Sequence, residues 1–212
     1  RRCNDYVLDS AAQWPGRIIP FSLVSPAEEG AVREAQRCLD AGAVGIGELM
    51  PDGQEFSLQD ERLATLIQLL EASNAPLMLH VNELVGHRYP GKGRVGPEDA
   101  YALATAHPAL NLILSHWGGG LPFYELMPSA RAALTNVWYD TAASPLLYDD
   151  RIFALVSRWA PNKVIFGTDY PLLTQRRFLD RVLSVEIPAE ELQAMLAGNL
   201  LTALGRSKTE KA

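Results

Sequence analysis

The sequence predicts an α/β fold built on a parallel sheet, and two observations support this. Short apolar runs alternate with longer segments whose apolar residues recur at helical spacing, and this strand-then-helix pair occurs six times along the 212 residues. The apolar runs also lack the polar alternation of a half-exposed strand, which indicates strands that are buried on both faces. Parallel strands connected by right-handed helical crossovers satisfy both observations.

Glycine, proline and serine mark the ends of several expected elements. Gly42 ends the first paired helix, Ser57 is suited to cap the second, and Pro97 and Pro108 bound the third. A helix-like segment over residues 5–13 precedes the first pair. In chain order, the expected strands are 17–26, 43–51, 76–83, 111–120, 136–144 and 163–171, their helices are 27–42, 57–73, 97–108, 121–134, 146–160 and 175–185, and a last helix covers 189–205.

Ionisable side chains recur at the carboxyl ends of five expected strands. They are Glu48, His80, His116, Asp140 and Asp169, and they follow one another at about the 30-residue length of one strand–helix unit. In an open sheet of sequential order, Glu48 and Asp169 would lie about 19 Å apart, because neighbouring strands are about 4.8 Å apart. In a closed barrel the same groups meet at one mouth, so we expect a (β/α)8 TIM barrel.

The length of the chain suggests that the barrel is incomplete. A (β/α)8 barrel has eight strands and about 250 residues, whereas the sequence predicts six strands in 212 residues and begins with Arg1. We therefore expect the first one or two βα units to be absent from this chain. Because no linker-like stretch divides it, residues 1–212 are expected to form a single, N-terminally incomplete domain.

Composition argues against several functional classes. With 48% hydrophobic and 21% charged residues, the chain is typical of globular proteins, and its net charge of -6 argues against a nucleic-acid partner. Cys3 and Cys38 alone do not make a disulfide framework, so we expect a cytoplasmic protein. No apolar run approaches the ~20 residues that span a membrane. The exposed helices of a barrel would also allow a homo-oligomer.

The residue types at the strand ends point to a divalent metal ion. Imidazole and carboxylate groups suit zinc, or manganese or iron, and we expect His80 and His116 to bind the ion. Asp169 would bind metal, deprotonate a metal-bound water, or do both. Glu48 is a further candidate ligand, and a salt bridge to a barrel lysine or arginine is its competing role. For each imidazole the competing role is that of a hydrogen-bonded core histidine, and for Asp169 it is stabilisation of a turn.

Several further residues are predicted to contact a small-molecule substrate. Trp117 precedes three glycines, which allow a substrate or a neighbouring loop to come close. His87 and Arg88 lie in the loop after the third expected strand, where Arg88 and its basic neighbours would form a cationic lid over a carboxylated substrate. A solvated loop is the competing interpretation. Tyr170, which follows Asp169, completes the predicted substrate contacts.

Five strings of the sequence resemble a known family, in order and over nearly the whole chain: GAVGIGELMP, PLMLHVNE, LSHWGGGLPFYELMP, FGTDYP and GNLLTALG. They resemble the amidohydrolase-related metal-dependent hydrolases, in the branch that includes aminocarboxymuconate-semialdehyde-type nonoxidative decarboxylases. The resemblance implies a (β/α)8 barrel with a divalent ion held by His80, His116 and Asp169, with Asp169 also the acid/base. The family's first strand ordinarily adds a His-x-His pair, which this sequence lacks.

These observations lead to one principal hypothesis and two competing ones. The principal hypothesis is hydrolysis of an ester, lactone or amide-type bond by a metal-activated water, whose proton Asp169 accepts. The second hypothesis is nonoxidative decarboxylation of an unsaturated or aromatic acid, in which the same site protonates carbon. The third is a non-catalytic barrel that binds a small molecule.

Overall fold

Six strands form one sheet in the order β1-β2-β3-β4-β5-β6 in the computed structural model, which describes residues 1–206. Every neighbouring pair is parallel, as the sequence predicted. Residues 207–212 of the expected domain lie outside the described part. The strands are β1 (Phe21–Ser22), β2 (Gly45–Leu49), β3 (Leu77–Leu79), β4 (Leu112–Leu114), β5 (Val137–Asp140) and β6 (Val164–Ile165).

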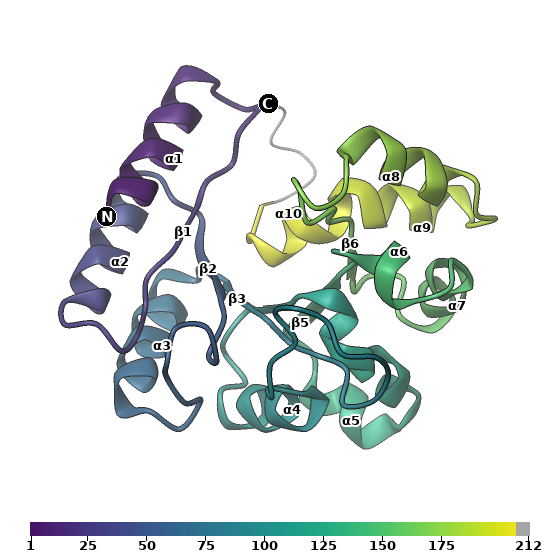
Figure 1. Ribbon diagram of the computed structural model, residues 1–212, viewed down its shortest axis with the longest axis horizontal. Helices are drawn as coiled ribbons and strands as arrows, with labels where there is room; N and C mark the ends of the chain where they lie inside the picture. Colours follow the sequence, from purple (N-terminus) through teal and green to yellow (C-terminus); the bar gives the residue numbers. More distant parts are fainter. Residues whose placement is uncertain (207–212) are drawn as a thin grey trace.

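Most of the helices form an arc around the outside of the strands (Figure 1). In the part of the chain that the structure describes, no helix combines the length and hydrophobicity needed to cross a lipid bilayer. The helical elements are α1 (Arg2–Gln13), α2 (Ala31–Asp40), α3 (Glu61–Ser73), α4 (Pro97–Ala106), η1 (His116–Leu126), α5 (Pro128–Ala133), α6 (Ser144–Leu147), α7 (Arg151–Trp159), α8 (Gln175–Leu183), α9 (Ala189–Gln193), η2 (Ala194–Gly198) and α10 (Asn199–Ala203).

The inner face of the sheet packs on itself and on α10. One cluster joins buried Ile113, Trp138 and Ile165 of β4, β5 and β6, with Ala203 of α10. Phe21 of the first strand packs against the same cluster. Residues of the first and last strands therefore pack in the same interior cluster, so the sheet curves around it as a barrel requires.

The outer face of the sheet carries the larger part of the core. The main cluster joins β2 to β5 with α2, α3 and α4, and includes the fully buried Leu49, Leu66 and Leu79. A second cluster packs α7 and α8 around Trp117, Phe153 and Phe178. The strands thus have apolar contacts on both faces, which explains their continuous hydrophobic runs.

The expected helix 121–134 is in fact two segments. The 3-10 segment η1 begins at His116, and five consecutive residues from His116 to Gly120 have positive φ between 53° and 95°. The α-helix α5 begins only at Pro128. Glycine tolerates the left-handed conformation, and prolines at 122 and 128 interrupt the regular helical hydrogen bonds, so a single helix cannot form here.

The expected helix 146–160 is also divided, into α6 and α7. Tyr148 is extended, with φ -133° and ψ 156°, and ends α6. The carboxylate of Asp149 then accepts a hydrogen bond from the Arg151 backbone N–H at 2.9 Å, which forms a turn just before α7. The expected last helix over 189–205 is continuous, but its middle part, η2, is π-helical.

Candidate metal centre and active site

Glu48, His80 and His116 converge at the carboxyl ends of β2, β3 and β4. Nδ1 of His80 lies 2.8 Å from Oε1 of Glu48, and Nε2 of His116 lies 3.7 Å from the same oxygen. The two imidazole nitrogens are 3.3 Å apart. All three donor atoms lie within 4.8 Å of one another, so one ion can contact them together.

Each histidine uses its other nitrogen to contact a neighbouring oxygen. Nε2 of His80 lies 3.2 Å from Oδ1 of Asn82, and Nδ1 of His116 lies 3.1 Å from the Ala142 carbonyl oxygen. Because both oxygens accept hydrogen bonds, this network assigns a proton to each of those nitrogens. A metal ion between the donors would then be bound by the lone pairs of His80 Nδ1 and His116 Nε2, which is the tautomer pattern of metal-binding histidines.

The pKa shifts of Glu48 and His80 indicate that a positive charge between the three donors would be stabilised. Burial opposes ionisation of Glu48, but the hydrogen bond and charge of His80, with the charge of His116, lower its pKa overall. Burial also opposes charge on His80, yet the Glu48 carboxylate raises the pKa of His80 above its ordinary value. A proton shared between His80 and Glu48 satisfies this geometry, and so does a divalent ion. The donor set therefore fits a metal ion with nitrogen and oxygen ligands.

Asp140, the last residue of β5, supports the loop that bears His116. Its Oδ1 accepts hydrogen bonds of 2.9 Å from the backbone N–H groups of His116 and Ala142. Within residues 1–206 its buried Oδ2 has no hydrogen-bond partner. Burial raises the pKa of Asp140 to about 6, with the His116 charge lowering it and the Glu48 charge raising it. Asp140 thus fixes the backbone on both sides of the His116–Ala142 contact.

A cavity of about 440 Å³ opens beside the histidines. His80, His116, His87 and Asp169 all line it, together with the aliphatic residues Ala143, Leu146, Leu147 and Leu172. Asp169 follows β6 and has a φ of 59°, so its loop turns sharply after the strand. The structure therefore places the predicted His80, His116, His87 and Asp169 around one space. Glu48 joins them through its contact with His80.

Three predicted substrate contacts lie elsewhere. Trp117 is fully buried, donates its indole N–H to the Ser144 hydroxyl at 2.9 Å and packs edge-on against Phe153. It is a core residue, because the left-handed turn directs it away from the cavity. Arg88 and Tyr170 are exposed and do not contribute to the cavity lining formed by the described residues. Tyr170 has 66% of its surface exposed.

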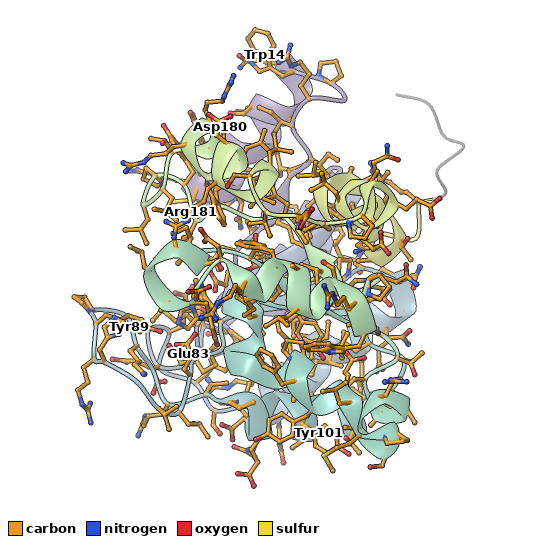
Figure 2. All side chains as sticks on the ribbon, turned by 90° about the vertical axis from the view of Figure 1, so that its right-hand side faces the viewer. Trp14, Glu83, Tyr89, Tyr101, Asp180 and Arg181 are labelled. Carbon is orange, nitrogen blue, oxygen red and sulfur yellow. The ribbon has the colours of Figure 1, made fainter. Side chains whose placement is uncertain are left out.

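The loop between β3 and α4 is fixed over the cavity by local hydrogen bonds. The Tyr89 hydroxyl donates to Glu83 at 2.9 Å, and the two residues lie side by side in Figure 2. Lys92 donates to the Val85 carbonyl, and Arg94 pairs with Asp52. Two of the cations in the predicted lid are thus bound to groups of the protein itself. Tyr89 and its neighbours Pro90 and Gly91 line the cavity instead.

Sequence reasoning missed Asn82 and gave Asp140 no role in the site. Asn82 lies two residues after His80, and the two-residue period of a strand places both side chains on one face. That spacing was a usable signal. Asp140 was recognised as a strand-end acid, but its part in holding His116 depends on backbone contacts that residue types do not reveal.

Comparison with known proteins identifies the family. The amidohydrolase family model matches residues 1–205. The chain belongs to the amidohydrolase family. A curated relative, gamma-resorcylate decarboxylase from Rhizobium radiobacter, is 30% identical over an alignment of 155 residues, which covers 58% of this chain and 45% of the relative. The chain thus matches less than half the length of this curated relative.

Solved structures confirm the barrel fold. An uncharacterized TIM-barrel protein from Bordetella bronchiseptica superposes with a TM-score of 0.78 at 20% identity, over 96% of this chain and 73% of that one. A dihydroxybenzoic acid decarboxylase from Polaromonas, solved with manganese and the inhibitor 2-nitroresorcinol, gives a TM-score of 0.68 at 17% identity, over 100% of this chain and 77% of that one. The amidohydrolase chain therefore has the TIM-barrel fold predicted from its strand-end residues.

Proposed function

We propose that this amidohydrolase-family chain forms the metal-binding part of a nonoxidative decarboxylase that acts on a small aromatic carboxylic acid. The proposal rests on one observation: the Glu48, His80 and His116 donors lie next to a cavity whose aliphatic lining includes Leu146 and Leu172. A carboxylate suits the metal end of such a cavity, and a flat apolar ring suits its leucine wall.

The names of the relatives support this reaction over the hydrolysis that we expected first. The curated relative decarboxylates gamma-resorcylate by its name, and the Polaromonas protein is a dihydroxybenzoic acid decarboxylase. Both act on carboxylated aromatic rings, whereas neither is named for cleaving an ester, lactone or amide. Because Glu48, His80 and His116 could hold a metal ion together, the site also favours an enzyme over a non-catalytic barrel.

Manganese is the metal that we propose, in place of the zinc expected from the sequence. Nitrogen and oxygen donors accommodate either ion, and the Polaromonas decarboxylase contains manganese. Glu48, His80 and His116 would hold the ion. Asp169, which lines the adjoining cavity, would be a further ligand or the acid. When bound, the ion would act as a Lewis acid that fixes the substrate carboxylate and stabilises negative charge.

Asp169 is the proposed proton donor, because it lines the same cavity as the two histidines. Its carboxyl would protonate the ring carbon that bears the carboxylate. The bond from that carbon to the carboxylate then breaks, its electron pair restores the ring, and carbon dioxide leaves. Water returns a proton to Asp169. One proton thus replaces carbon dioxide on the ring, and no oxidant or reductant is consumed.

The test uses the full-length protein with a panel of hydroxybenzoic acids and, in parallel, a panel of esters, lactones and amides. We expect manganese-dependent release of carbon dioxide and, in D2O, one deuterium at the carbon that lost the carboxylate. Asp169→Asn should abolish both the carbon dioxide release and the deuterium incorporation while the protein still binds manganese. Hydrolysis of the second panel without carbon dioxide release from the first would refute the proposal.

A further inference from the structure

The loop between β3 and α4 packs over the candidate active-site cavity through one side chain. From Leu84 to Gly91 every residue except Tyr89 is exposed. Tyr89 is half-buried and lines the cavity, together with Pro90 and Gly91, which follow it. These three residues form the loop wall of the cavity. The position of this wall therefore depends on what holds Tyr89.

Glu83 holds Tyr89 by its hydroxyl. The hydroxyl donates to Oε2 of Glu83 at 2.9 Å, and the two side chains lie side by side in Figure 2. Lys92 instead donates to the carbonyl oxygens of Val85 and His87, which belong to the same loop. The Lys92 contacts therefore stiffen the loop internally, whereas the Glu83 contact ties it to the segment that directly follows the metal-site strand β3.

The second carboxylate oxygen of Glu83 is buried without a donor. Within residues 1–206 its Oε1 has no hydrogen-bond partner. A carboxylate can accept hydrogen bonds at both oxygens, and a buried acceptor that receives none is costly. The site therefore calls for a second hydroxyl or N–H beside Glu83.

Tyr148 is placed to supply that donor. It ends α6, is half-buried, and packs against the cluster around Trp117 and Phe153. Burial raises the pKa of its phenol, and the nearby negative charge of Glu83 raises it further, so the hydroxyl keeps its proton. A phenol hydroxyl can rotate its proton toward an acceptor. Leu146 and Leu147, directly before Tyr148, form the α6 wall of the cavity.

We propose that Glu83 is a positioning residue for this cavity, whose carboxylate accepts hydrogen bonds from both Tyr89 and Tyr148 and so joins the loop wall to the α6 wall. Glu83 is not among the described residues that line the cavity, so it acts through the two tyrosines. The joined walls keep the cavity formed before a ligand enters, and the ligand then does not have to order the loop. The inference rests on the proposed function only in treating this cavity as the substrate site.

The experiment uses the full-length protein, with circular dichroism to show that each variant is folded. Hydrogen exchange of the backbone amides over residues 84–92 should become on the order of tenfold faster in Glu83→Ala, as expected for loss of a hydrogen bond to a charged group. Tyr148→Phe should also speed this exchange, but not when it is added to Glu83→Ala, because both changes remove the same contact. Glu83→Gln keeps an acceptor oxygen for Tyr89 and should restore most of the protection.

Ligand binding is the second measurement, made by calorimetry with benzoate and manganese-loaded protein. Glu83→Ala should bind benzoate several-fold more weakly, because part of the binding free energy then orders the loop, while its manganese affinity should not change. Glu98→Ala is the matched control, since Glu98 is an exposed glutamate in the first turn of α4, just after the same loop. This variant should change neither the exchange nor the binding.

Three results would overturn the proposal: unchanged loop exchange in Glu83→Ala, unchanged loop exchange in Tyr148→Phe, or an equal loss of manganese and benzoate affinity in Glu83→Ala. The last result would show a general structural role for Glu83 instead of a positioning one. If the exchange results are as expected but the unaltered protein does not bind benzoate, Glu83 positions the loop as proposed and the assignment of this cavity to an aromatic acid fails.

Discussion

Replacement of Asn82 by alanine should weaken metal binding although Asn82 is not itself a proposed ligand. Its Oδ1 lies 3.2 Å from Nε2 of His80 and also accepts the Gly93 backbone N–H at 3.0 Å. Asn82 is 1% exposed, so water cannot readily take the place of its amide. The variant would leave the Nε2–H of His80 without an acceptor and would free the ring to rotate away from Glu48.

The expected magnitude follows from this lost contact. A buried donor without a partner costs about 1–3 kcal/mol, which corresponds to about fivefold to 150-fold in an equilibrium constant. Loss of a residue that orients a metal ligand typically lowers metal affinity about 10–100-fold. The two estimates overlap, so we expect Asn82→Ala to bind manganese about 10–100-fold more weakly than the unaltered protein.

The assay is competition for manganese against a chelator of known affinity, at a temperature where circular dichroism shows each variant to be folded. Asn82→Asp keeps an acceptor oxygen for His80 and should retain tight binding. Asn136→Ala controls for loss of an asparagine, because Asn136 donates to the Pro108 carbonyl, away from the metal centre. An Asn82→Ala variant that is folded and binds manganese within twofold of the unaltered protein would refute the reasoning.

Three further predictions concern the metal, the pH dependence of stability and the turn after His116. Chelation should abolish activity and manganese should restore it, whereas Glu48→Gln, which removes the charged donor, should lower manganese affinity by at least about 100-fold in the same competition assay. Burial raises the pKa of Glu125 above 4.5, although the hydrogen bond from Tyr139 opposes this shift. The folded protein therefore favours the protonated carboxyl, so the contribution of Glu125 to stability is largest below pH 4.5 and is lost as the pH rises through the raised pKa. Glu125→Gln should therefore unfold at higher urea concentration than the unaltered protein at pH 8 but not at pH 4; an equal difference at both pH values would contradict this. A Cβ at Gly119, whose φ is +63°, would collide with the Asn82 carbonyl oxygen, so Gly119→Ala should lower the free energy of unfolding by about 1–3 kcal/mol, and an unchanged urea midpoint would exclude that clash.

The barrel and much of the site could be predicted from the sequence because both depend on periodicity. The strand-end spacing of Glu48, His80 and His116 reflects one repeated βα unit, and the parallel sheet brings their donor atoms together. The single domain, the homo-oligomer and the cytoplasmic location stay predictions. The choice between hydrolysis and decarboxylation depends on cavity shape, which residue types do not determine.

Local backbone geometry set the limit of the sequence prediction. The WGGG string drew attention to Trp117 as a substrate contact, but consecutive left-handed residues direct its indole into the core. The same limit applies to Arg88 and Tyr170, whose sequence neighbours line the cavity while their own side chains are exposed. A strand-end position predicts which edge a residue lies on, but not the direction of its side chain.

The left-handed turn from His116 to Gly120 connects two layers of the molecule through adjacent residues. His116 faces the candidate metal centre, while Trp117 donates its indole N–H to Ser144 of α6 and packs edge-on against Phe153 of α7. The orientation of one candidate metal ligand therefore depends on side-chain packing in the helical layer outside the sheet. Substitutions in α6 or α7 that displace Trp117 would therefore also move His116, so a redesign that keeps the candidate metal centre should leave Trp117 unchanged.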